Sequence, residues 1–410
     1  MRKTKKPARI SRRTLLKSGA AVAFSGVLGS TAIAAQPARQ SVYEALGLRQ
    51  VINATGTVTN LGGSIMPPEV VAAWADAARH FVNLLELQDR VGERIAKLIG
   101  VEAALVTTGA AGSLLLGTAA VVTRGQPRFI RQLPDTKGMK NEVLLQKAHH
   151  SCYDNQLTDV GVRLIDVDSA ADIKRAVNDR TVLMFFMNKD DAEGRIRRAE
   201  WVALARQYKI PTLLDAAADV PPAERLSEYN RMGFDLVAFS GGKAIRGPND
   251  TGLLLGRKEL IDAAKQNTNP HCGTIGRMMK VSKEDMIAQL TAVERFVRLD
   301  HKAELREWER RIGVIEQAVR DIPTVRCERI VPPIANHVPH LILTWDEKRV
   351  RLTRERFARM LIETDPPIYI GRVPGTGERG VVISVLTLQA GEERTVADRV
   401  AAILRKAAGR

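Results

Sequence analysis

The sequence predicts an α/β protein. We expect a large domain with a mostly parallel, doubly wound sheet, followed by a smaller C-terminal α+β domain. Over residues 100–256, short apolar runs alternate with patterns of helical spacing, which is typical of consecutive βαβ units. Several of these runs are apolar at every position and are bounded by glycine or proline, as strands covered on both faces are. The 410 residues are enough for two domains with a large hydrophobic core.

The expected elements follow the chain in order. A short helix at 41–49 and a strand at 51–57 come first, and apolar residues then recur at helical spacing from Glu69 to Gly100, after prolines that suit a first helical turn. The large domain is expected to continue with strands at 101–108, 141–146, 161–167, 181–187, 210–215, 234–239 and 251–256 and with helices at 114–122, 151–157, 170–177 and 199–208. A linking helix at 283–309 leads to the smaller domain. There we expect one helix that ends at 320, two helices at 354–364 and 394–406, and strands at 341–345 and 381–388.

The net charge of +16 is unevenly distributed. Residues 1–35 hold eight of the basic residues and no acidic residue, so half of the excess lies in this short stretch. The remaining charge is spread thinly, without the long basic clusters of a nucleic-acid groove. We therefore expect no nucleic-acid partner.

The first 35 residues have the pattern of a twin-arginine signal peptide. Arg12 and Arg13 precede a weakly apolar stretch from Ala20 to Ile33, and an Ala-x-Ala pattern allows cleavage after Ala34 or the residue that follows it. The stretch is too short and too rich in glycine, alanine and serine for a stable membrane span. An uncleaved membrane anchor or a chance arginine pair is the alternative. We predict a periplasmic protein exported by the twin-arginine machinery, with domains at 1–35, 36–300 and 301–410.

The three cysteines are widely spaced. Cys152, Cys272 and Cys327 form no Cys-x-x-Cys pair, which predicts neither a zinc site nor a disulfide framework. We expect no metal. One disulfide in an oxidising compartment stays open.

A lysine in a loop of small residues is the first candidate for chemistry. Lys243 lies in the run 240–248, which contains three glycines and separates the apolar runs 234–239 and 251–256. Small neighbours let another part of the backbone approach, and burial lowers the pKa of such an amine, as a Schiff-base lysine requires. On this stretch alone, a surface hairpin whose lysine keeps the loop soluble is the alternative.

A carboxylate upstream makes the prediction more specific. Asp215 ends an apolar run and is followed by three alanines, so it lies at the carboxyl end of a strand, where open α/β sheets bind ligands. Pyridoxal 5'-phosphate requires a carboxylate against its ring nitrogen and a lysine for its aldehyde. The order Asp-x-Ala, Ser-x-x-Lys, Gly-Pro therefore predicts a site for this cofactor. Its residues would be Asp215, Ala217, Ser240 and Lys243.

The turn after the first large-domain strand predicts the phosphate end of this site. Small residues open an apolar helix here, and free backbone amides at a helix N-terminus bind anions. We assign Thr108, Gly109 and Ala110 to the cofactor phosphate. Simple packing of the helix on the strand is the alternative for this turn.

Four stretches resemble a known family, namely residues 51–57, 239–243, 276–281 and 365–368. They are similar to fold-type I pyridoxal-phosphate enzymes of the group related to bacterial selenocysteine synthase, the seryl-tRNA selenium transferase. From about residue 48 to the C-terminus, the chain resembles the D-glucosaminate-6-phosphate ammonia-lyase-like branch more than the tRNA enzyme. The resemblance implies the fold-type I transferase fold.

The resemblance also implies roles for single residues. His149 matches the position of a flat side chain that stacks on the cofactor ring, with a helix-capping histidine as the alternative. Asn53 and Thr55 would lie near the substrate. Arg372 would bind the substrate carboxylate through its forked guanidinium, with a surface arginine as the alternative.

A loop after the lysine segment is expected to cross to a second subunit. Family resemblance implies a homodimer or a larger homo-oligomer with shared active sites, in which Thr274, Arg277 or Lys280 completes the phosphate site of the partner. The sequence does not choose among these three.

These residues predict an enzyme that acts on an amino acid or amino sugar acid. Lys243 would form the Schiff base and then remove the proton at the α-carbon, and elimination would give a 2-keto acid and ammonia. The same residues would also suit an amino-acid racemase or an aminotransferase, and these two activities remain alternatives. A selenium transferase acting on charged tRNA is disfavoured, because the catalytic domain starts almost directly after the leader and because export would separate the enzyme from tRNA. A cofactor-free relative is disfavoured by the presence of both Asp215 and Lys243.

Overall fold

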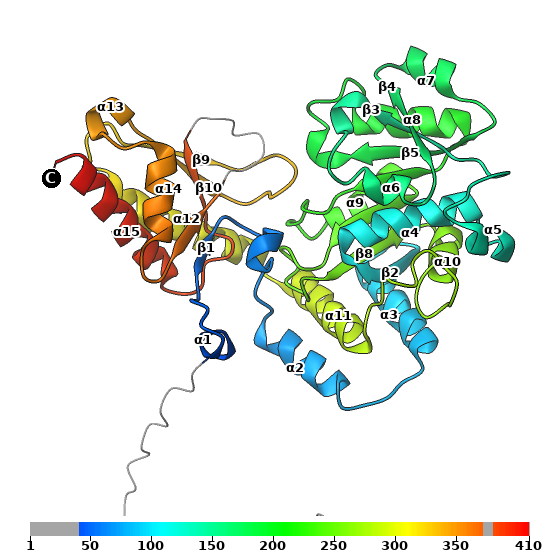
Figure 1. Ribbon diagram of the computed structural model, residues 1–410, viewed down its shortest axis with the longest axis horizontal. Helices are drawn as coiled ribbons and strands as arrows, with labels where there is room; N and C mark the ends of the chain where they lie inside the picture. The colour runs from blue at the N-terminus through cyan, green and yellow to red at the C-terminus, as the bar shows by residue number, and fades with distance from the viewer. Residues whose placement is uncertain (1–40, 372–379, 410) are drawn as a thin grey trace, which may run out of the picture. The chain divides into compact units, whose positions relative to one another are not determined.

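The computed structural model describes residues 41–371 and 380–409 (Figure 1). The predicted signal peptide and the predicted carboxylate-binding Arg372 lie outside the described residues. Helix α1 (Val42–Ala45) begins after Ser41, whose hydroxyl accepts a hydrogen bond from the Glu44 amide while the Glu44 carboxylate accepts one from the Ser41 amide. This reciprocal cap explains where the short helix begins.

A seven-stranded sheet forms the centre of the large domain. Its strands lie in the order β2 (Ala103–Thr108), β8 (Thr251–Gly256), β7 (Leu236–Ser240), β6 (Thr212–Asp215), β5 (Thr181–Met187), β3 (Glu142–Gln146) and β4 (Arg163–Val167). All pairs are parallel except those of β8, which runs antiparallel to both β2 and β7. The predicted mostly parallel, doubly wound sheet is confirmed.

Helices cover both faces of this sheet, as Figure 1 shows. One face packs against α4 (Gly109–Thr123) and α10 (Lys258–Gln266), and the other against α3 (Leu84–Ile99), α8 (Arg198–Tyr208), α9 (Arg225–Met232) and α11 (Lys283–Arg298). Successive residues of a strand point to opposite faces of the sheet and therefore belong to different hydrophobic clusters: Leu213 to the cluster with α4 and Leu214 to the cluster with α8. Helix α4 is apolar on all sides and almost entirely buried, as such a helix must be.

Two long predicted helices are each interrupted. The stretch from residue 69 to 100 forms α2 (Pro68–Ala77) and α3, because the Asn83 side chain accepts hydrogen bonds from the Leu85 and Glu86 amides and starts a new helix. The predicted helix 283–309 likewise ends at Arg298, and α12 (His301–Val319) begins after Asp300, which caps it. The predicted helix 151–157 is also wrong in extent, since only α6 (Asn155–Thr158) forms there.

The remaining helices of the large domain are short. They are α5 (Pro127–Gln132), which was not expected, and α7 (Ala170–Ala176), which matches its predicted range closely.

The C-terminal part has its own core around a three-stranded antiparallel sheet. The strands lie in the order β12 (Val381–Ser384), β10 (His340–Thr344) and β9 (Arg326–Ile330), and the helices are α12, α13 (Glu347–Val350), α14 (Arg354–Ile362) and α15 (Glu392–Ala407). Strand β9 was not expected, because its polar composition hides it.

The first strand of the chain joins this C-terminal core. β1 (Ile52–Ala54) pairs in parallel with β11 (Ile368–Ile370), and Ile52 and Ala54 are buried among residues of the C-terminal domain. The predicted division at residues 36–300 and 301–410 remains a prediction, and these three residues belong spatially with the later part.

Within the described residues, no helix is long and apolar enough to cross a membrane. The same part of the chain contains no group of three or more potential metal ligands, and Cys152, Cys272 and Cys327 are exposed and unpaired.

Candidate active site

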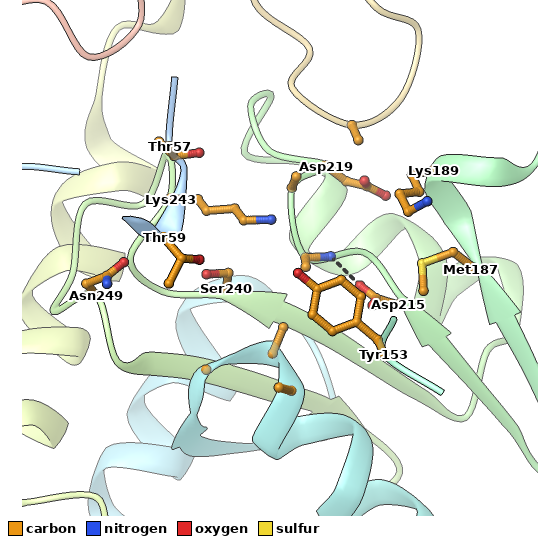
Figure 2. Close-up of a pocket in the computed structure, with 16 residues that line it drawn as sticks. Thr57, Thr59, Tyr153, Met187, Lys189, Asp215, Asp219, Ser240, Lys243 and Asn249 are labelled. Carbon is orange, nitrogen blue, oxygen red and sulfur yellow. Dashed lines mark hydrogen bonds between the residues drawn. The ribbon is translucent and has the colours of Figure 1, made fainter. Parts of the chain in front are cut away.

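A cavity of about 260 Å³ lies at the carboxyl ends of β6 and β7 (Figure 2). Sites for small ligands commonly occupy ~300–1,000 Å³, so the cavity suits a small group. Predicted residues that line it are Gly109, Ala110, Asp215, Ala217, Ser240 and Lys243. The structure therefore brings together the two chemical groups and the helix turn on which the cofactor prediction depended.

The loop that carries Lys243 is folded tightly against α11. A side chain added at Gly247 would place its Cβ 1.9 Å from the Gln289 Oε1 atom, and one at Gly241 would place it 2.3 Å away. Gln289 cannot easily move, because it is fully buried and its Oε1 accepts a hydrogen bond of 2.6 Å from the Thr251 hydroxyl. The glycines thus let this loop approach the helix closely enough to turn Lys243 into the cavity.

Lys243 and Asp215 influence each other's charge. Burial lowers the pKa of the Lys243 amine, and the carboxylates of Asp215 and Asp219 oppose this effect. Burial also raises the pKa of the Asp215 carboxyl. Two interactions lower this pKa in part: the Ala217 amide donates a hydrogen bond of 2.9 Å to Oδ1, and Lys243 lies nearby with its positive charge. A buried carboxylate with so little compensation is suited to a ligand that brings a positive charge.

The N-terminus of α4 forms another part of the wall. Its first residues, Gly109 to Ala111, line the cavity, and the N-cap residue Thr108 makes no side-chain hydrogen bond to the amides of the first turn. Those amides therefore have no protein partner from the cap and can bind an anion. Thr108 itself does not line the cavity, and its buried Oγ1 atom, beside Gly112, has no hydrogen-bond partner among the described residues.

These features fit pyridoxal phosphate. The uncapped turn of α4 would hold the phosphate, Asp215 would hold the protonated ring nitrogen, and Lys243 would bind the aldehyde carbon. Each group comes from a different strand end of one sheet, which fixes their relative positions.

Comparisons with known proteins identify the family. A model of the aminotransferase class-V family matches residues 133–291. D-glucosaminate-6-phosphate ammonia lyase of Salmonella typhimurium is 32% identical over 267 residues, which cover 62% of this chain and 70% of that enzyme. The chain belongs to the family of this ammonia lyase.

Two further comparisons agree. The L-seryl-tRNA(Sec) selenium transferase of Caldanaerobacter subterraneus is 29% identical over 275 residues, 58% of this chain and 56% of that enzyme. A solved structure of D-glucosaminate-6-phosphate ammonia-lyase matches with a TM-score of 0.77 at 26% identity and covers 90% of this chain and 100% of the other. The predicted fold-type I architecture, the pyridoxal phosphate cofactor and the assignment as a pyridoxal-phosphate-dependent lyase are confirmed.

In this ammonia-lyase family protein, a second buried acid lines the cavity. Asp219 is 1% exposed, and its Oδ2 atom accepts hydrogen bonds from the Asn188 amide group (2.5 Å) and the Tyr229 hydroxyl (3.0 Å). Burial raises the pKa of Asp219 to about 6, although these two hydrogen bonds oppose the rise, and the nearby Asp215 adds to it. Sequence reasoning missed Asp219, although it follows the Asp215 strand by only four residues.

The structure does not place His149 in the cavity wall. His149 is fully buried, its Nδ1 accepts a hydrogen bond of 3.3 Å from the Met187 amide, and its ring meets the Phe186 ring edge-on at 4.4 Å. Burial lowers its pKa to about 4, so the ring is neutral. The flat side chain in the wall is instead Tyr153, which Figure 2 shows beside Asp215. The turn after β3 directs His149 inward and the following loop brings Tyr153 to the cavity.

The neighbouring His150 is a surface residue. Its two ring nitrogens lie 2.5 Å from Asp154 and 2.8 Å from Asp166. Burial alone would lower its pKa, but the hydrogen bonds to these carboxylates raise it overall. His150 therefore contributes to local stability and not to the cavity.

The predicted substrate residues Asn53 and Thr55 form a local turn. The Asn53 amide group donates to the Gly56 carbonyl (2.9 Å), and its oxygen accepts from the Thr55 hydroxyl (2.7 Å). Neither lines the cavity, whereas Thr57 and Thr59, just beyond Gly56, do. The turn at Gly56, with φ of +96°, redirects the chain between the two pairs.

The predicted partner-subunit loop lies on the surface of this chain. Arg277 and Lys280 are exposed, Thr274 is half-buried, and its hydroxyl donates to the His271 carbonyl (3.0 Å). None of the three lines the cavity of its own chain. Their role in a second subunit stays a prediction.

Other wall residues carried no sequence signal. Lys189 comes from a short 3-10 helix (Asn188–Asp190) after β5, and Asn249 comes from a loop. Ala335 comes from a loop of the C-terminal domain, in which the Asn336 amide donates to the Ala218 carbonyl (2.8 Å). Only the tertiary fold brings these segments to the cavity.

Proposed function

We propose that the protein is an exported ammonia lyase that converts a β-hydroxy amino acid, or a related amino sugar acid, into a 2-keto acid and ammonia. The observation that supports this is the convergence of Lys243, Asp215 and the uncapped turn of α4 in one cavity, in a member of an ammonia-lyase family. The bonds to the β-hydroxyl and to the amino group break: the hydroxyl leaves as water, the β-carbon gains a hydrogen, and one water is taken up when ammonia is released and the α-carbon becomes a carbonyl. The β-carbon is reduced as the α-carbon is oxidised, so no external oxidant or reductant is needed.

The bound cofactor supplies a sink for negative charge that develops at the α-carbon. Lys243 is the base that removes the proton from this carbon, because burial favours its neutral amine and the loop directs it into the cavity. Asp215 keeps the proton on the ring nitrogen, since a buried carboxylate stabilises a neighbouring positive charge. Arg372, outside the described residues, would bind the substrate carboxylate.

The substrate is proposed to be unphosphorylated. The relative from Salmonella is named for a phosphorylated amino sugar acid. Phosphorylated metabolites are held largely in the cytoplasm, whereas the twin-arginine pattern of Arg12 and Arg13 supports a periplasmic location. A periplasmic enzyme would meet free amino acids.

A homo-oligomer with shared sites is also proposed. The exposed positions of Arg277 and Lys280 support it, since they leave these side chains available to a second subunit. Exposed apolar residues, among them Trp74, Phe81 and Met278, support it further. Mixing inactive Lys243→Ala chains with inactive Arg277→Ala chains should restore activity, and no restoration would refute sharing through Arg277.

The decisive experiment incubates the mature protein, loaded with cofactor, with D- and L-β-hydroxy amino acids and amino sugar acids. We expect keto acid and ammonia in equal amounts. Racemised substrate or transferred amino groups would instead identify a racemase or an aminotransferase. Lys243→Ala should lose the visible absorption of the bound cofactor, and Asp215→Ala should keep some binding but lose turnover by orders of magnitude. Arg372→Ala should lower kcat/KM by roughly 10- to 150-fold, the loss of one charge-assisted contact.

A further inference from the structure

A second cavity of about 380 Å³ lies next to the cofactor cavity. Thr57 belongs to both walls, and Ala244 and Arg246, which line the second cavity, directly follow Lys243, which lines the first. The same short loop therefore sends one cationic side chain into each cavity. Part of the second wall is apolar and includes Phe296 and Trp308.

Arg246 has unused hydrogen-bonding capacity. Its Nε donates a hydrogen bond of 2.9 Å to the Ile65 carbonyl. Among the described residues, no carboxylate lies within ion-pair distance of its guanidinium, and its two terminal nitrogens make no hydrogen bond. Burial lowers the pKa of Arg246, the charges of Arg295 and Arg311 add to this effect, and the more distant carboxylates of Glu304 and Glu69 oppose it. A partly buried guanidinium without a counterion is suited to binding an anion.

The other charged side chains that line this cavity lie beside partners within the protein. Glu307 accepts hydrogen bonds of 2.8 Å from both Arg310 and Arg311, which lower its pKa to about 2. Glu304 lies 3.3 Å from His301. Among the described residues that line this cavity, Arg246 is therefore the cation without a partner carboxylate, since Arg311 is paired with Glu307.

The backbone of Arg246 is also unfavourable. Its φ is 63°, in the left-handed region, where a residue other than glycine costs ~1–3 kcal/mol. A glycine would avoid this strain, and a polar neutral side chain would avoid burying a charge. The left-handed backbone and the partly buried charge of Arg246 both destabilise the folded protein, which indicates that this arginine serves in ligand binding.

We propose that Arg246 binds a carboxylate at the far end of the substrate, away from the carbon on which Lys243 acts. This inference rests on the proposed function and specifies the substrate as an amino acid with a second acidic group. The group is distal because the guanidinium lines a different cavity from the Lys243 amine, and Thr57 lines both cavities. A carboxylate fits better than a phosphate, because one guanidinium fork matches one carboxylate, whereas a dianion would leave a buried negative charge without a partner.

The test measures binding and needs no turnover. Glutarate and pentanoate have the same chain length, carry no amine and differ in one terminal carboxylate. For the cofactor-loaded enzyme, calorimetry should show that glutarate binds more tightly than pentanoate. Arg246→Gln should raise the dissociation constant of glutarate roughly 10- to 150-fold, as expected for one lost charge-assisted contact, and should leave the dissociation constant of pentanoate unchanged. Arg246→Lys should retain part of the preference, because a lysine is a charge without the fork.

Two controls make the result decisive. Arg298→Gln, which removes an exposed arginine on α11, should change neither dissociation constant. Arg246→Asn tolerates a left-handed backbone, so it keeps the test possible should the glutamine variant not fold. Equal binding of the two probes by the wild type, or a preference that survives in Arg246→Gln and Arg246→Asn, would overturn the proposal. An unchanged visible spectrum of the bound cofactor in these variants would show that the Lys243 site is intact. Failure of the Arg246 proposal would then not contradict the proposed lyase function.

Discussion

The buried acid Asp219 allows a quantitative prediction about stability. In the cofactor-free protein, burial raises its pKa from an ordinary value of 3.8 to about 6. This difference corresponds to ~3 kcal/mol between the charged and neutral forms. Because the folded-state pKa is raised, the favourable contribution of the neutral acid is complete below pH 3.8 and is lost as the pH rises through about 6.

Replacing Asp219 by asparagine removes the charge but keeps the acceptor. The asparagine oxygen can still accept from Asn188 and Tyr229, and burial raises the pKa of the Tyr229 hydroxyl so that it stays a donor. Asp219→Asn should therefore be more stable than the wild type at pH 7.5 by up to ~3 kcal/mol, and the difference should shrink toward pH 4.

Urea unfolding of both proteins at pH 4.5, 6.0 and 7.5, without cofactor, measures this difference. Asp159→Asn, at an exposed aspartate, serves as the matched control and should show no comparable pH dependence. A variant that is less stable than the wild type at pH 7.5, or a difference that does not change with pH, would refute the reasoning.

Three further predictions concern other parts of the chain. Gly247→Ala should destabilise the protein by ~1–3 kcal/mol in thermal unfolding and weaken cofactor binding, because its Cβ would meet the buried Gln289. Gly313→Ala, in α12, should stabilise the protein by up to ~1 kcal/mol, because its Cβ would make an ordinary van der Waals contact of 3.7 Å with the Arg329 side chain. His150→Gln should lower the free energy of unfolding by no more than ~1 kcal/mol near pH 6, since solvent screens the partly exposed histidine. This loss should vanish as the pH rises through the raised pKa of the histidine. An equal loss of stability at pH 9 would contradict a contribution from the ion pairs. Replacing Arg12 and Arg13 together by lysine should leave unprocessed protein in the cytoplasm, and normal periplasmic amounts on immunoblots would exclude the twin-arginine route.

Residues at the ends of apolar runs were predictable from the sequence. Asp215 is the last residue of β6, and Gly109 and Lys243 come after β2 and β7, whose inner positions are mostly apolar, so the strand end and the edge of the sheet could be located together. The two interrupted helices also carried a signal, because Asn83 and Asp300 are residue types that begin helices.

Residues in irregular loops were not predictable in the same way. Tyr153 and His149 are four positions apart, and the short turn after β3 decides which of them reaches the cavity. Arg246 became informative only when the structure showed its left-handed backbone and, within the described part of the chain, no carboxylate at ion-pair distance. Loop direction and charge compensation depend on contacts between distant segments, which periodicity does not describe.

The pairing of β1 with β11 has a consequence for synthesis. Ile52 lies opposite Ile368, so β1 can find its partner strand only after a segment more than 300 positions later in the chain has been made. Ile52 and Ala54, buried in the folded protein, lack the cover of β11 until then. A product truncated before Ile368 would therefore keep an apolar strand without its partner, and full-length and truncated products would differ in exposed apolar surface near the N-terminal part of the fold.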